Sequence, residues 1–254
     1  MGEFLGIGGY ARKPEGWFSW QHIVFVTSLL AVTISLAVIL GKRNRQRSLR
    51  EKNRVLIFAA ILIDAIEIFK LAVFCVRSGG VSTLLYNLPL FLCSIQLITI
   101  PLAAFSKGRV KEASLDFVLI FGLLGAVLGT YGAGQNYGAY PMMSIDNVAS
   151  GITHSISGFC AVYIAVSGMA SMKRRNIGVT FAILLGFCAA AYAVNRLVEY
   201  NYMFLMRGDG TPYDILHGLV GGSPVLYPIF VVVLFLIYIA AFYLVYFLIK
   251  RRKG

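Results

Sequence analysis

The strongest constraint on the fold is a series of long apolar runs that are separated by short basic gaps. A helix rises about 1.5 Å per residue, so roughly 20 residues cross the hydrocarbon core of a bilayer. Seven runs in the sequence reach or approach that length. We therefore predict one polytopic membrane domain over residues 1–254, an all-α seven-transmembrane-helix bundle with spans at about 18–40, 55–76, 86–105, 115–131, 149–172, 177–200 and 225–249.

The positions of lysine and arginine predict the orientation of these spans. Seventeen of the 23 lysine and arginine residues lie on one side, in the gaps 41–54, 106–114 and 173–175 and in the tail 250–254. Cytoplasmic loops carry such an excess. We expect the N-terminus outside, the C-terminus in the cytoplasm and a location in the cell membrane. Because topology accounts for the net charge of +12, we expect no nucleic acid as a partner.

Four cysteines all lie inside apolar runs: Cys75, Cys93, Cys160 and Cys188. They form no CxxC pair, so the sequence indicates neither a metal site nor a disulfide framework. We expect no metal and no cofactor.

Polar residues inside the predicted spans gather near the outer rim. Counted at 1.5 Å per residue, Cys93 lies about 10 Å, His154 about 8 Å and His22 about 6 Å below that rim. An imidazole within hydrogen-bond reach of a thiol can take its proton and leave a thiolate nucleophile. Cys93 and His154 are therefore a candidate catalytic pair. The competing interpretation is that the thiol is a small hydrophobic side chain and the histidine a helix-packing group.

A second set of polar residues is charged. Asp64, Glu67 and Lys70 follow one another at three-residue spacing along one side of a predicted helix, and Arg196 and Glu199 lie near the end of another. Such charges either neutralise one another as a structural lock or mark an ion-coupled or solute site. The alternative function is thus a transporter or ligand-binding protein. Against a transporter, we find no internal repeat and no pair of broken helices.

Gly125 and Gly129 form a GxxxG pattern that favours close contact between helices. A third interpretation is therefore a non-catalytic partner subunit. A homo-oligomer and a partner membrane subunit both stay open.

Several motifs resemble the YwaF-type family of bacterial seven-helix membrane proteins. They are LPLFLC at 88–93, the membrane histidine His154, NYMFLMR at 201–207 and the Tyr227-Pro228 start of the last span. The resemblance covers nearly the whole chain. That family is similar to a eukaryotic group of seven-helix lipid acyltransferases, transmembrane protein one-six-four.

The resemblance implies acyl transfer between membrane phospholipids, with Cys93 as the nucleophile and His154 as its base. Around this pair we expect a substrate-binding shell of His22, Gln96, Asn195, Asn201 and Tyr202. Many relatives have a histidine shortly before the motif cysteine, where this chain has Phe91. This departure weakens any mechanism that needs a second imidazole on that span.

Overall fold

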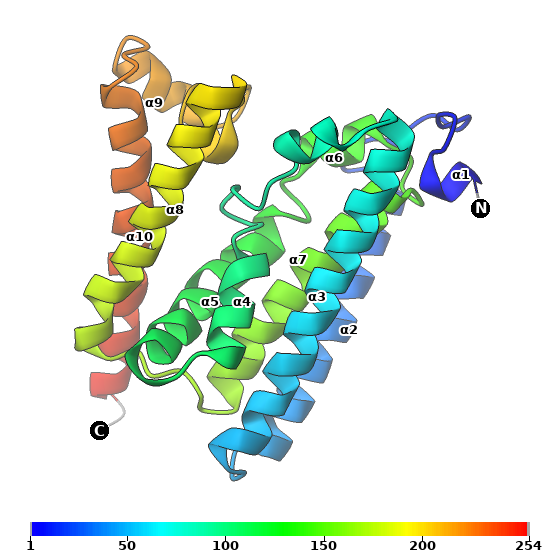
Figure 1. Cartoon of the computed structure of the whole chain (residues 1–254). Coiled ribbons are helices and arrows are strands. Elements are labelled where there is room, and N and C mark those ends of the chain that lie inside the picture. Colours follow the sequence, from blue (N-terminus) through cyan, green and yellow to red (C-terminus); the bar gives the residue numbers. More distant parts are fainter. Residues whose placement is uncertain (1, 253–254) are drawn as a thin grey trace. The chain divides into compact units, whose positions relative to one another are not determined.

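The computed structural model describes residues 2–252, and the ordered elements found there are helices and turns (Figure 1). The prediction of an all-helical membrane protein is confirmed. Within the described range, four helices are long and apolar enough to cross a membrane, at Trp20–Asn44, Ile145–Val166, Arg174–Val198 and Leu226–Arg251. The count of seven spans and their orientation remain predictions.

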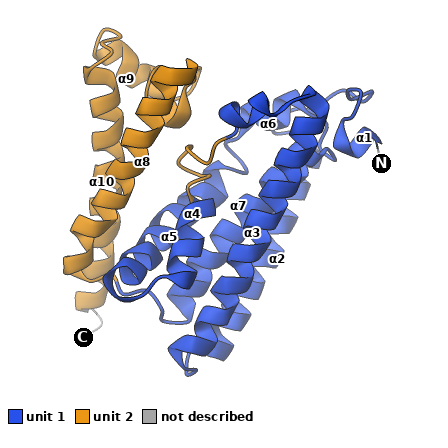
Figure 2. Cartoon of the chain, viewed as in Figure 1, with its two compact units in different colours: residues 1–87, 96–171 blue, residues 88–95, 172–254 orange. Residues whose placement is uncertain are grey.

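The chain forms two compact units, which Figure 2 shows in separate colours. Unit 1 contains residues 1–87 and 96–171, and unit 2 contains residues 88–95 and 172–254. The helices of unit 1 are α1 (Gly2–Leu5), α2 (Trp20–Asn44), α3 (Leu49–Ser78), η1 (Val81–Tyr86), α4 (Gln96–Phe105), α5 (Gly108–Leu128), α6 (Gly134–Ala139) and α7 (Ile145–Val166). Those of unit 2 are η2 (Arg174–Asn176), α8 (Ile177–Val198), η3 (Tyr202–Phe204), α9 (Tyr213–Leu219) and α10 (Leu226–Arg252).

Helix α7 forms the core of unit 1. In its most apolar stretch, 61% is buried inside the protein, whereas the same share for α2 is 11%. Small residues let α5 approach it closely, because a Cβ at Gly122 would lie 2.7 Å from the carbonyl oxygen of Ser157, and one at Gly158 would lie 2.7 Å from the Cβ of Ala126. The close contact is therefore made at Gly122 and Gly158, outside the predicted pattern of Gly125 and Gly129.

Local signals in the sequence explain where α3 begins and ends. Ser48 caps its N-terminus, and Ser48 and Glu51 form a reciprocal capping box. Gly79 ends the helix in the left-handed region at φ 69°, where a glycine has no steric penalty. The helix extends beyond the predicted span 55–76 at both ends.

The predicted span 86–105 differs most from the structure. Helix α4 covers only its second half, and residues 88–95 form bends and turns. Pro89 has no backbone N–H, and it disfavours helical backbone at Leu88. Asn87 also ends η1, and its side-chain amide donates to the carbonyl of Thr83 at 2.9 Å. Cys93 therefore lies on an irregular segment, and its predicted depth, which assumed a helix, no longer applies.

The predicted span 149–172 is also shifted. Helix α7 begins after Ser144, whose hydroxyl accepts the N–H of Asn147, and it ends at Val166 before Gly168 at φ 74°. His154 consequently lies in the third turn of the helix, whereas the predicted span placed it in the second turn.

Helix α4 is short, and a lysine side chain caps its C-terminal end. The Lys111 ammonium donates to the carbonyls of Ala103 and Ala104, at 2.7 and 3.2 Å, and to the Asn53 side chain at 2.6 Å. A cation at the last carbonyls of a helix stabilises that end. The cap fixes the position of α4 in unit 1.

Candidate functional site

The Cys93 segment is held in place by other parts of unit 2. The Leu88 N–H donates to the Tyr202 hydroxyl at 3.0 Å. The Phe91 ring packs against Tyr202 at 5.1 Å and against Phe204 at 6.1 Å between ring centroids. The side chain of Cys93, which forms no disulfide, is half-buried within this segment.

Hydrogen bonds inside the segment define its turn. The Phe91 N–H donates to the Ser94 hydroxyl at 3.0 Å, and the Phe91 carbonyl accepts the Ile95 N–H at 3.0 Å. Phe91 therefore acts here as an aromatic anchor for the turn that carries Cys93.

Asn195 fixes the residue that holds the segment. Its amide nitrogen donates to the Tyr202 carbonyl at 3.0 Å, and its amide oxygen accepts the Tyr202 N–H at 2.6 Å. The side chain of Asn195 is buried, so both of its polar ends serve the backbone of Tyr202. In addition, burial raises the pKa of Tyr202, which keeps its hydroxyl protonated.

Asn201 fixes the turn that follows Tyr202. Its oxygen accepts the Met206 N–H at 2.9 Å, while its nitrogen donates to the Arg207 carbonyl at 2.8 Å. The backbone around it is strained, because Glu199, Met203 and Phe204 have φ values of 54°, 56° and 56°. Such positions cost about 1–3 kcal/mol each and persist only where surrounding contacts enforce them.

Asn195, Asn201 and Tyr202 were predicted to bind substrate. The structure shows the three side chains engaged in holding the loop that carries Tyr202, and Tyr202 in turn holds the Cys93 segment. Substrate contact by these residues stays a prediction.

His154 belongs to unit 1, where its ring is half-buried on α7. Nδ1 lies 2.7 Å from the Ser150 carbonyl oxygen, one turn earlier. A carbonyl only accepts, so Nδ1 carries the proton and Nε2 of the neutral ring keeps its lone pair. This tautomer is the one that a general base acting through Nε2 requires.

Gly129, at the end of α5, provides the space for the His154 ring. A Cβ at this position would overlap Cδ2 and Nε2 of the imidazole. The sequence pattern assigned Gly129 only to helix contact and gave no sign that its neighbour would be a histidine.

His22 is buried, and both of its ring nitrogens are hydrogen-bonded within unit 1. Nδ1 accepts the Phe18 N–H at 3.2 Å, so Nε2 carries the proton and donates to the Thr130 carbonyl at 3.1 Å. The ring also packs on Tyr137 at 4.3 Å. His22 therefore fixes the backbone directly after Gly129, which is a structural role next to His154.

Gln96, also predicted to contact substrate, is buried at the start of α4. Its amide oxygen accepts the Thr99 hydroxyl at 3.0 Å, and its amide nitrogen has no hydrogen-bond partner within residues 2–252. Contact with substrate stays a prediction for this residue.

The predicted charged cluster is distributed over both units. On α3, Lys70 and Glu67 form an ion pair at 2.7 Å, and Asp64 lines a groove beside α4. Arg196 and Glu199 are exposed residues of unit 2. Among the residues that the structure describes, no group of three or more His, Cys, Asp or Glu side chains is arranged to hold a metal ion.

Comparison with known proteins gives one match. The model of the TMEM164 family matches residues 17–246, a range that includes Cys93, His154 and the loop around Tyr202. No curated protein and no solved structure matches the chain.

Proposed function

Because the chain belongs to the TMEM164 family, a family of membrane proteins, we propose that it is a membrane-embedded lipid acyltransferase that carries the acyl group on Cys93. The observation that supports this most is the conformation of residues 88–95. These residues belong to an apolar run, yet they are irregular and are held by Tyr202. Irregular backbone at membrane depth is tolerated only where protein or a cavity surrounds it, and it commonly lines a site.

In the proposed reaction, the Cys93 thiolate attacks the ester carbonyl of a membrane phospholipid. The C–S bond forms, the ester C–O bond breaks, and the lysophospholipid leaves as an alcohol after it takes up a proton. A hydroxyl of an acceptor lipid then attacks the thioester, and the thiol is regenerated. Neither step needs a cofactor or a redox partner.

We assign the proton transfers to His154. The hydrogen bond to the Ser150 carbonyl places the ring proton on Nδ1, so Nε2 is the nitrogen that accepts a proton in this scheme. In this scheme Nε2 takes the proton of the Cys93 thiol, gives it to the leaving alcohol, and later takes the proton of the acceptor hydroxyl. Membrane phospholipids are the proposed partners, and the cell membrane is the proposed location.

The test measures transfer of a labelled acyl chain between phospholipids by the purified full chain, together with the intact mass of the protein. Cys93→Ser and His154→Ala are each expected to lower the rate by about 100-fold or more, the usual cost of losing a nucleophile or a general base. Wild-type protein is expected to carry one acyl group that hydroxylamine removes.

The matched control is Cys75→Ser, because Cys75 is also a free, half-buried thiol but lies on α3. Its activity should equal that of the wild type. Full acyl transfer by Cys93→Ser, or an acyl group that stays on the protein after this change, would reject the proposal.

A further inference from the structure

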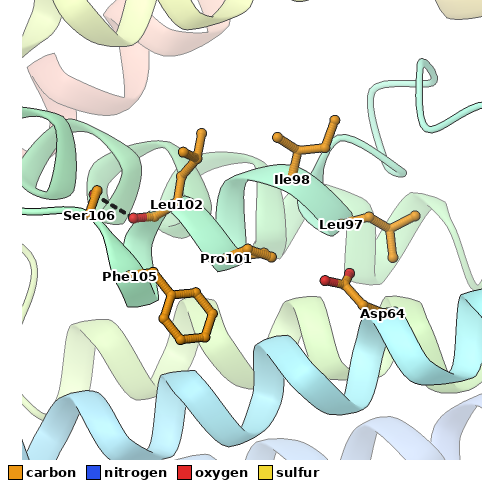
Figure 3. Close-up of a pocket in the computed structure, with 7 residues that line it drawn as sticks. All are labelled: Asp64, Leu97, Ile98, Pro101, Leu102, Phe105 and Ser106. Carbon is orange, nitrogen blue, oxygen red and sulfur yellow. Dashed lines mark hydrogen bonds between the residues drawn. The ribbon is translucent and has the colours of Figure 1, made fainter.

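An open groove of unit 1 lies between α3 and α4 (Figure 3). It encloses about 530 Å³, which is in the range of small-molecule sites. Five apolar residues of α4 line it: Leu97, Ile98, Pro101, Leu102 and Phe105. The carboxylate of Asp64 on α3 points toward the side of α4 that carries Pro101 (Figure 3). Ser106 marks one end.

The Asp64 carboxylate is the charged group of this groove. It is half-buried, and the described part of the chain offers it neither a hydrogen bond nor an ion pair. Glu67 and Lys70, its neighbours on α3, neutralise each other at 2.7 Å. Asp64 is therefore an ionisable side chain without a counter-charge beside an apolar wall, and such residues in membrane proteins commonly mark binding sites.

The other polar side chain of the groove, Ser106, also accepts hydrogen bonds. The Ser106 hydroxyl already donates to the Leu102 carbonyl, so its oxygen can only accept further. The site thus offers hydrogen-bond acceptors and a carboxyl group without a counter-charge, and a ligand that brings donors and a positive charge fits both.

We propose that this groove binds a membrane-dissolved primary amine with a long alkyl chain. The ammonium group donates to Asp64, and the chain lies along the aliphatic and aromatic wall from Leu97 to Phe105. The ten-residue helix α4 provides roughly 15 Å of such wall. The groove lies within unit 1 and includes neither Cys93 nor His154, so this site does not depend on the proposed acyl transfer.

The experiment uses the purified full chain and a dodecylamine that carries a photoreactive diazirine on its alkyl chain. The twin probe has a hydroxyl in place of the amine. The amine is expected to label peptides of α3 or α4, and unmodified dodecylamine should compete for that labelling. The alcohol is expected to label about tenfold less, because it lacks the charge-assisted hydrogen bond.

Asp64→Asn keeps the shape of the side chain and removes its charge, so it is expected to reduce amine labelling about tenfold or more. The control is Glu199→Gln, a comparable change at an exposed residue of unit 2, which should keep the labelling. Leu97→Trp keeps Asp64 and fills the groove. It should also lose the labelling, and this variant tests the site even if Asp64→Asn does not fold.

Equal labelling by amine and alcohol would overturn the proposal, as would full labelling of Leu97→Trp. A stable dimer that dissociates in Asp64→Asn would also overturn it, because the groove would then belong to a contact with a second copy.

Discussion

Two histidines of unit 1 have opposite tautomers, and neighbouring carbonyls decide which. His154 donates through Nδ1 to Ser150, whereas His22 donates through Nε2 to Thr130. Both rings lie against the end of α5, where Gly129 and Thr130 are adjacent residues. Gly129 therefore leaves space for the His154 ring, and the carbonyl of the next residue, Thr130, accepts the hydrogen bond of His22.

The space at Gly129 can be tested by filling it. Gly129→Ala is compatible with the backbone, because φ is −77°, but its methyl group would overlap the His154 ring. Forcing an extra carbon into a packed site costs about 1–3 kcal/mol. We expect a lower unfolding temperature and a loss of acyl transfer, measured in the same detergent-purified samples.

Gly138→Ala is the control for this change, because a Cβ at Gly138 meets no atom within 4 Å. It should leave stability and transfer unchanged. Equal stability and activity of Gly129→Ala and the wild type would show that the ring does not depend on this glycine.

At the scale of elements, the segment 88–95 and the loop around Tyr202 form one structure. One hydrogen bond joins them, from the backbone N–H of Leu88 to the side-chain hydroxyl of Tyr202, and the Phe91 ring packs on the Tyr202 ring. The strained residues Met203 and Phe204 follow Tyr202 directly. The conformation of the Cys93 segment is therefore coupled to that of the loop.

Tyr202→Phe tests this coupling, because it keeps the ring and removes the acceptor of the Leu88 N–H. Loss of one such bond costs about 1 kcal/mol, so the segment should open several-fold more often. We expect faster hydrogen exchange at residues 88–95 and faster alkylation of Cys93, both read by mass spectrometry.

Tyr213→Phe serves as the control, since Tyr213 stacks on Phe204 at 5.3 Å in the same aromatic group. Its exchange and alkylation rates should match those of the wild type. If Tyr202→Phe alters neither rate, the hydroxyl does not hold the segment.

Hydropathy predicted the long helices well, because an 18-residue apolar window needs no tertiary information. It failed at 86–105, where the apolar residues continue but Asn87 and Pro89 interrupt the helix. Asn87 and Pro89 indicated an interruption of the helix, but the prediction gave more weight to the hydropathy of the run. The candidate residues Cys93 and His154 came from their similar predicted depths, which assumed helical spans, and from motif resemblance. The roles of Gly129 and Asn195 could not be predicted, since both depend on contacts made after folding.

At the scale of the whole molecule, unit 1 also holds the segment that precedes its first long helix. The Tyr10 hydroxyl donates to Asp146, and Arg77 pairs with the same carboxylate at 2.8 Å. Glu15 accepts the Met142 N–H at 2.7 Å, and the Trp17 indole donates to the Tyr131 carbonyl at 2.7 Å. The segment is thus fixed by side chains at several points.

The Tyr10 contact predicts a dependence of stability on pH. Burial, together with the hydrogen bond to Asp146, raises the pKa of Tyr10. A raised pKa in the folded state gives stability that is complete below the unfolded pKa of about 10 and is lost as pH rises through the folded value. The wild type should therefore lose stability above about pH 10, measured as the unfolding midpoint.

Tyr10→Phe removes the titrating group and is the comparison for this measurement. The variant should be less stable than the wild type at neutral pH, and the difference should shrink as pH rises above about 10. A difference that stays constant over this range would exclude the Tyr10 hydroxyl as its source.

The division of the chain into units has a consequence for biosynthesis. Residues 88–95 belong to unit 2, and the Tyr202 side chain that holds them lies 114 positions later than Leu88. At 5–20 residues per second, a ribosome needs roughly 6 to 23 seconds to make that interval. Through this period the Cys93 segment lacks the partner that shapes it. A nascent chain that stops before Tyr202 carries the thiol but not the turn that presents it, so the proposed chemistry begins only when synthesis is nearly complete.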